Sequence, residues 1–278
     1  MSEERVSQTL RRSFRARCSF DLISLINWVC LAATTFAAAL LYAVSGFGFA
    51  VLAAPLYLLF VDPPRAIQLV IIISTALSFT VVSGLRRAIA WGVLLRLTIG
   101  ALAGLPLGLL AFRYSDPLVV RLGVGAMILS FAVLMALRRR GRGQDLAPPA
   151  LSLGGDLGAG AASGIATALI GMAGPPALIY LLLAKAGART VRATLLAFFV
   201  LAYGATLVSH ALTIGIPGST WIAAGTLVPF AFLGGFTGRP IGDRLGTESF
   251  TLLAIALLAV AGLYTVASAG IGLTIRER

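Results

Sequence analysis

Apolar runs separated by short polar segments dominate the chain. Eight runs are long enough to cross a bilayer as helices, because a helix rises about 1.5 Å per residue and the hydrocarbon core is about 30 Å thick. These runs cover residues 22–44, 66–84, 93–112, 118–137, 153–170, 193–210, 220–238 and 249–269. Two shorter apolar pieces, 47–61 and 176–186, each follow a glycine-rich break. The pattern predicts an all-α integral membrane protein.

One segment, residues 138–150, interrupts the apolar pattern clearly. Its sequence, RRRGRGQDLAPPA, is charged at first and then rich in glycine, proline and alanine. The run 22–44 is too long for a cleaved signal peptide, so we expect it to be retained as the first helix. We therefore predict a basic cytoplasmic N-terminal segment (1–21), a first transmembrane repeat (22–137), a linker (138–150), a second transmembrane repeat (151–270) and a C-terminal tail (271–278).

The two halves of the chain carry the same features in the same order. Gly100, Gly104, Pro106 and Gly108 recur at identical spacing as Gly234, Gly238, Pro240 and Gly242. Arg65 and Arg192 each head an apolar run, and each half has an earlier break, at 45–48 and 171–176. Internal duplication is typical of secondary transporters, which bind substrate between the repeats. We expect two homologous halves of about four crossings, each with a broken or re-entrant short helix.

The orientation of the halves depends on the two short pieces. If these pieces dip in and return, each half crosses four times, and the basic N-terminus and the linker both lie inside, as the positive-inside rule favours. If they cross, each half has five crossings, the repeats are inverted, and the linker lies opposite the N-terminus. Charge favours the first interpretation, and the second stays open.

Composition supports the membrane assignment. Hydrophobic residues make up 59% of the chain and charged residues only 12%, whereas soluble domains are about 25% charged. The net charge of +12 comes from arginines near the N-terminus, in the linker and between apolar runs. Because no basic face alternates with stacking aromatic residues, we expect no nucleic-acid partner. The expected location is the cell inner membrane, with the lipid bilayer as partner and an undetermined oligomeric state.

Residues that perform catalysis or bind metals are scarce in the apolar runs. None of the ten acidic residues lies in the middle of a run, and the single histidine, His210, ends one. Cys18 and Cys30 have no metal-ligand spacing. We therefore predict no enzyme, no metal site and no cofactor. A cation carrier is also disfavoured, since such proteins usually place an acidic residue in the membrane.

The glycine-rich breaks are the best candidates for a substrate site. A helix that restarts inside the membrane directs unpaired N–H groups and its positive end at the gap, which suits an anion. Ser45 begins the first break, and Pro175 and Pro176 fit the first turn of a new helix after the second. Close helix packing is the alternative role for these glycines, and it is the favoured role for the Gly-x-x-x-Gly stretches.

Polar side chains within the runs supply further candidates. Gln68, Ser74, Thr75 and Ser78 form a polar stripe in the run 66–84, and Tyr203 and Thr206 lie in the run 193–210. Hydroxyl groups of this kind often bond to their own helix. Arg239, between Gly238 and Pro240, could contact an anion or extend to the interface, and Arg65 and Arg192 share this ambiguity. Gln68 and Arg239 join the candidate substrate-binding residues.

These motifs also resemble a known family. SGFGFAVLAAPL at 45–56, GMAGPPALIYLL at 171–182 and the paired glycine–proline stretches resemble the TauE/SafE family of sulfite and organosulfonate exporters, from about residue 30 to 270. The resemblance implies a secondary transporter that moves a small anion such as sulfite or sulfoacetate, often outward. By motif position it implies that the site lies near Gly46, Gly48, Pro55, Gly171, Gly174, Pro175 and Pro176.

One departure from the family concerns the substrate. The family often has a run of glycines after the first break, whereas this chain has Phe49 and Ala50, whose side chains would narrow a pocket. An uncoupled channel or a carrier for another small solute is the alternative function. Coupling of transport to protons is left open.

Overall fold

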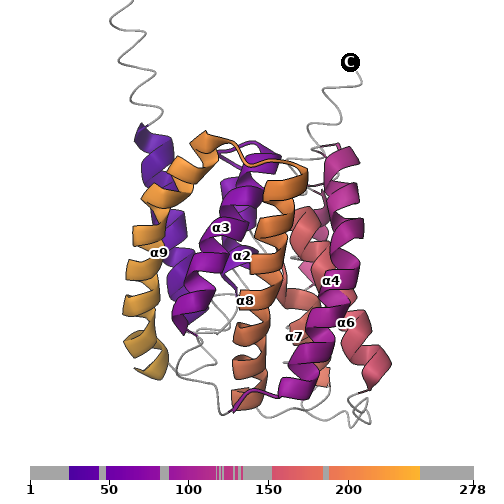
Figure 1. The fold of residues 1–278 in the computed structure, drawn as a ribbon. Coiled ribbons are helices and arrows are strands. Elements are labelled where there is room, and N and C mark those ends of the chain that lie inside the picture. Colours follow the sequence, from indigo (N-terminus) through magenta and orange to yellow (C-terminus); the bar gives the residue numbers. More distant parts are fainter. Residues whose placement is uncertain are drawn as a thin grey trace, which may run out of the picture.

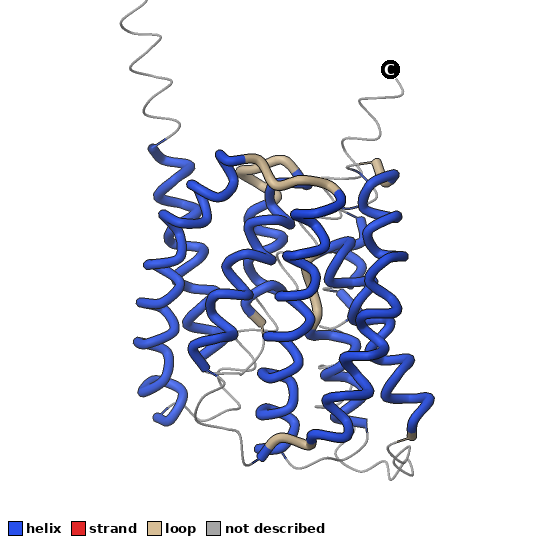
Figure 2. The backbone as a smooth tube through the Cα atoms, in the orientation of Figure 1, coloured by secondary structure: helices blue, strands red, loops and turns tan. Residues whose placement is uncertain are grey.

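The computed structural model describes residues 25–43, 48–81, 88–116, 152–183 and 188–244, together with scattered residues between 118 and 133. All the secondary structure that it describes is helical (Figure 2), which confirms the all-α prediction. Within these described ranges, five helices are long and apolar enough to cross a membrane: Leu25–Ala43, Trp91–Tyr114, Leu153–Ile170, Thr190–Thr213 and Gly218–Gly238. The predicted run 249–269 lies outside the described residues.

The helices form one bundle (Figure 1). After the N-terminal helix, Leu25–Ala43, they are α2 (Phe49–Tyr57), α3 (Pro63–Val81), α4 (Trp91–Tyr114), α6 (Leu153–Ile170), α7 (Gly174–Leu183), α8 (Ala188–Thr213) and α9 (Gly218–Arg244). The N-terminal helix and α9 lie together on one side of the bundle, and α4 and α6 lie on the other. The helices α2, α3, α7 and α8 occupy the middle and carry most of the largest fully buried side chains.

Local sequence explains several helix ends. The Ser152 hydroxyl caps α6 by accepting a hydrogen bond from the Gly155 N–H. Pro63 and Pro64 begin α3, where a missing N–H costs nothing. Gly171 ends α6 and Gly215 follows α8. Both have positive φ angles (73° and 83°), which residues with a Cβ atom rarely adopt.

The Gly-x-x-x-Gly stretch of α4 packs directly on α6, in the most extensive contact between the labelled helices. A Cβ atom added at Gly100 or Gly104 would lie 2.2 Å from the carbonyl oxygen of Leu157 or Ala161, respectively. Gly160 in α6 packs in the same way on the Leu97 carbonyl. These distances confirm that the glycines of this stretch allow close packing.

The second stretch makes an equivalent contact on the other side of the bundle. A Cβ atom at Gly234 in α9 would lie 2.3 Å from the Phe36 carbonyl oxygen, and one at Gly238 would lie 2.7 Å from that of Leu40. The helices that carry the third apolar run of each half, α4 and α9, therefore pack against the first long helix of the other half. In both pairs the contacts advance together along the two sequences, so each pair runs parallel.

The chain directions follow from hydrogen bonds at one end of α8. Arg192, near the start of α8, donates to the carbonyl oxygen of Ala43 at the end of the N-terminal helix (3.0 Å). Thr194 accepts a hydrogen bond from the N–H of Ala90, just before α4 (3.1 Å). Since α6 runs parallel to α4, it starts at the end of the bundle where the N-terminal helix finishes. We call this the lower end and the opposite one the upper end, as drawn in Figure 1.

Candidate functional site

The two short helices, α2 and α7, begin at a common inner cavity. Gly48 precedes α2 with a φ of 117°, and Gly174 is the first residue of α7. Both line a cavity of about 10 Å³, together with Tyr42, Phe49, Ala50, Val51, Ser74, Phe199 and Tyr203. A cavity of that volume has room for about one water molecule. The structure therefore brings together one residue of each break that the sequence singled out, Gly48 and Gly174.

Three hydroxyl groups give this cavity its polarity. The Tyr42 hydroxyl pairs with that of Ser78 at 3.3 Å. The Tyr203 hydroxyl accepts a hydrogen bond from the Ala173 N–H and donates one to the Gly171 carbonyl, both at 3.3 Å, so it holds the non-helical backbone of the second break. Ser74 lies beside Tyr203. Its side chain is buried, and apart from the nearby Tyr203 hydroxyl it has no hydrogen-bond partner within the described chain.

Among the described residues, Arg192 is a cation close to this cavity. Its guanidinium is fixed on the Ala43 carbonyl and is close enough to Tyr42 to interact with it electrostatically. None of the described residues that line the cavity carries a charged side chain. An anion there would meet hydroxyls, the start of α2 and a nearby positive charge, without a carboxylate to repel it.

The other predicted site residues have different positions. Ser45, Gly46 and the side chain of Arg239 lie outside the described residues. Gly171 lies against the Val70 side chain of α3 rather than lining the cavity. Pro55 is buried inside α2. Gln68 donates a hydrogen bond to the Gly215 carbonyl (3.0 Å) and so ties α3 to the turn between α8 and α9.

Pro175 and Pro176 occupy the first turn of α7, as the sequence suggested. Neither is among the residues that line the inner cavity. Because proline has no N–H, these positions cannot donate hydrogen bonds to a substrate.

Sequence reasoning found some hydroxyls of the site and missed one. Thr75 and Thr206 bond to carbonyls of their own helices, at 2.7 and 2.8 Å, as expected for such side chains. Ser74 and Tyr203, from the same runs, face the cavity instead. Tyr42 was missed, because it lies near the end of an apolar run with no polar neighbour to mark it.

Two polar side chains are buried away from the inner cavity. Asp156 in α6 is fully buried and forms a salt bridge to Arg96 of α4, with 2.8 Å between Oδ2 and Nε. His210 of α8 is also fully buried, with Nε2 3.0 Å from the Ala168 carbonyl and its ring against Phe112. Both tie α6 to a neighbouring helix. No cluster of three or more potential metal ligands occurs in the described ranges.

Comparison with known proteins gives the family. The sequence model of the sulfite exporter TauE/SafE family matches residues 31–265. Neither the curated proteins nor the solved structures gave a match. The family match covers all the described helices except the first residues of the N-terminal helix, and it includes both breaks and both glycine stretches. The chain therefore belongs to the TauE/SafE sulfite exporter family.

Proposed function

We propose that this protein is a secondary transporter that exports a small anion, such as sulfite or an organosulfonate, and that the anion binds in the inner cavity between the two halves. Membership of a family of transporters for sulfite or related anions supports the general function. The apolar helices support a multi-pass membrane protein. The observation that carries the site is the convergence of α2 and α7 on one cavity lined with hydroxyls.

The hydrogen-bond donors around the cavity are unequal. Phe49, Ala50 and Val51 line it in the first turn of α2, where backbone N–H groups have no partner within the helix. The first turn of α7 offers the N–H of Gly174 alone, because prolines follow. The anion is therefore bound mainly by α2, with the Ser74 hydroxyl as a further donor and Arg192 supplying charge from the lower end.

The volume of the cavity implies movement during transport. Sulfite is larger than the single water molecule for which there is room, so the helices must separate to admit it. The bonds of Arg192 to Ala43 and of Ala90 to Thr194 hold the lower end together. Breaking them would open the cavity toward that end, as a transporter with alternating access requires.

The proposed architecture consists of two repeats, at 22–137 and 151–270, each with a broken helix. The paired glycine contacts support this division, since each joins the helix of the third apolar run of one half to the first long helix of the other. The opposite directions of the N-terminal helix and α6 favour inverted repeats, with the short helices completing a crossing. They do not favour the interpretation with four crossings in each half that the charge distribution preferred.

A labelling experiment tests this topology. In a background where Cys18 and Cys30 are replaced by serine, Ser7→Cys and Gln144→Cys should be labelled from opposite sides of the membrane by an impermeant thiol reagent. With the N-terminus in the cytoplasm, as we propose for this inner-membrane protein, Gln144→Cys reacts in intact cells and Ser7→Cys only after permeabilisation. Labelling of both from one side would contradict inverted repeats.

Counterflow tests the function and the site together. Purified protein in liposomes loaded with unlabelled sulfite should concentrate labelled sulfite transiently, which a carrier does and an uncoupled channel does not. Ser74→Ala and Tyr203→Phe should each lower this exchange severalfold, by removing a hydrogen bond of about 0.5–1.5 kcal/mol. Thr206→Val, whose hydroxyl serves only its own helix, is the matched control. Flux without counterflow would favour the channel.

The same assay bears on coupling. An inward or outward proton gradient that drives uphill sulfite movement would show coupling to protons, whereas exchange that ignores the gradient would show a uniporter. Neither outcome affects the position of the site, which the variants test separately.

A further inference from the structure

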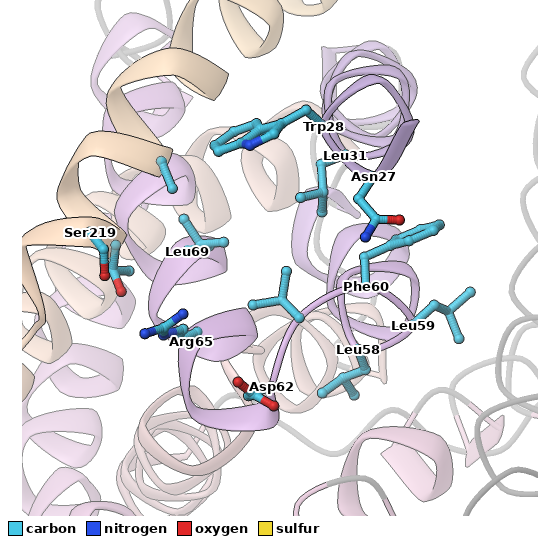
Figure 3. A pocket seen from close by; sticks show the side chains of 13 residues that line it. Asn27, Trp28, Leu31, Leu58, Leu59, Phe60, Asp62, Arg65, Leu69 and Ser219 are labelled. Carbon is cyan, nitrogen blue, oxygen red and sulfur yellow. The ribbon is translucent and has the colours of Figure 1, made fainter. Parts of the chain in front are cut away.

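A second and larger cavity opens at the upper end of the bundle. Its volume is about 530 Å³, and it lies between the N-terminal helix, the turn after α2, the start of α3 and the start of α9 (Figure 3). It shares no lining residue with the inner cavity. The proposed function does not use it.

The wall of this cavity near α9 carries the features of an anion site. Ser219 and Thr220 line it in the first turn of α9, a helix of 27 residues whose positive end lies there. Thr220 is only 2% exposed, and its hydroxyl has no hydrogen-bond partner in the described part of the chain. A buried hydroxyl normally has a partner, so a ligand group in the cavity would satisfy it.

Positive charge comes from the facing helix. Arg65 is the one cation among the described lining residues, and it forms no salt bridge with any described residue. Asp62 also lines the cavity and would repel an anion. In the view of Figure 3, the Arg65 side chain lies between those of Ser219 and Asp62. The favourable position for an acid group is therefore on the Ser219 side of Arg65.

The remaining lining side chains are apolar except for that of Asn27. Trp28 and Leu31 of the N-terminal helix and Leu69 of α3 line the cavity around its hollow centre (Figure 3). A cavity of this volume takes a molecule much larger than sulfite, and these side chains would bury an apolar portion.

We propose that this cavity is a second binding station, for a ligand with one acid group attached to an apolar portion. The acid group binds between the Arg65 guanidinium, the Thr220 hydroxyl and the free N–H of Ser219, and the apolar portion packs on Trp28, Leu31 and Leu69. A free organic anion and the head of an anionic lipid share this chemistry, and the experiment separates them.

The test compares two probes of equal shape, 2-naphthoate and its neutral amide 2-naphthamide. Binding is measured by calorimetry on the full-length protein in nanodiscs of phosphatidylcholine. The charged probe should bind about tenfold or more tightly than the amide, the scale of charge-assisted hydrogen bonds. Arg65→Gln should remove this difference, Thr220→Val should reduce it severalfold, and Asp62→Asn should increase it.

Two control variants show whether naphthoate binding depends on this cavity. Arg113→Gln removes an exposed arginine at the end of α4, at the same end of the bundle but outside the cavity, and should leave naphthoate binding unchanged. Ser74→Ala alters the inner cavity and should also leave it unchanged. An equal loss in Arg65→Gln and Arg113→Gln, or a persistent preference for naphthoate in Arg65→Gln, would overturn the proposal.

A lipid arm identifies the source of the acid group. If nanodiscs containing phosphatidylglycerol weaken naphthoate binding to the wild type and not the residual binding to Arg65→Gln, the station accepts a lipid head. If they leave binding unchanged, it accepts free anions. Either of these two outcomes supports the proposed binding station. Equal weakening of naphthoate binding by phosphatidylglycerol in the wild type and in Arg65→Gln counts against it.

Discussion

The glycines of the α4–α6 interface and those of the two breaks have different neighbours. At Gly104 and Gly160, an added Cβ atom would lie 2.2 Å from a carbonyl oxygen of the facing helix, and main chain cannot move aside as a side chain can. At Gly174, the nearest atom would be the tip of the Phe199 ring, at 3.3 Å, and Phe199 itself lines the inner cavity. The interface glycines hold two helices together, whereas Gly174 leaves space beside a cavity.

The difference shows how one residue type can have two roles in a membrane protein. Between apolar helices in lipid, the hydrophobic effect gives little attraction, so association depends on close van der Waals packing. Glycine in that setting contributes to folding. At a break, glycine permits non-helical backbone and an opening beside a helix start, where we propose that the anion binds. Spacing in the sequence does not separate these roles, but the atoms facing each Cβ position do.

The largest effect is expected at the interface, where two nearby glycines of α6 provide a matched pair. Gly160→Ala places a methyl group against the Leu97 carbonyl and should abolish most of the folded protein, since the two helices must move apart. Gly158→Ala faces open space and should be neutral or stabilising, by up to about 1 kcal/mol of helix propensity. The monodisperse fraction after detergent extraction measures both. Equal monodisperse fractions for the two variants would show that the α4–α6 interface can accommodate a methyl group at Gly160.

At the second break, we expect a substitution to lower transport and to leave the fold intact. Gly174→Ala fills a cavity with room for about one water molecule and should lower sulfite counterflow by about tenfold or more. The fold should survive, because Gly174 lacks a positive φ angle and only the end of the Phe199 side chain must shift. Gly225→Ala in α9, which faces open space, is the control. Normal transport by Gly174→Ala at equal abundance would leave the inner cavity without a role.

Much of this arrangement could be predicted from the sequence, because it depends on local pattern. The apolar runs predicted the helices, and glycines at every fourth position marked a packing face. The relation between the two breaks needed the fold, since Gly48 and Gly174 meet only when the halves assemble. The direction in which each helix runs also depends on contacts between distant parts of the chain. Basic clusters at the N-terminus and in the linker favoured placing both on the same side of the membrane, whereas the hydrogen bonds at the start of α8 and the packing of Gly100 on α6 give the N-terminal helix and α6 opposite directions.

Asp156 illustrates the same limit at a single residue. From the sequence it begins an apolar run, a position that usually lies in the interface. The fold buries it completely, because Arg96 in the other half supplies a partner across the α4–α6 interface. The salt bridge therefore belongs to the packing region of the molecule and not to the inner cavity.

This pair should have no effect on transport and an asymmetric effect on stability. The Arg96 side chain is 36% exposed and that of Asp156 is 0% exposed. The charge that remains after one partner is removed is therefore partly solvated in one variant and buried in the other. Arg96→Gln leaves a buried carboxylate without its cation and should cost more stability, up to about 3 kcal/mol, below the full scale for a buried pair because one partner is partly solvated. Asp156→Asn leaves an arginine that can turn toward water and should cost less. Thermal unfolding in detergent would rank the two.

The double variant completes this test. Arg96→Gln combined with Asp156→Asn removes both charges, so its loss should be smaller than the sum of the single losses, as expected for residues in direct contact. Sulfite counterflow by the folded fraction should stay close to that of the wild type in all three variants, since neither residue lines the inner cavity. If stability is retained and counterflow falls in Arg96→Gln, the pair serves transport, and the separation between a packing region and a binding region is wrong for α4 and α6.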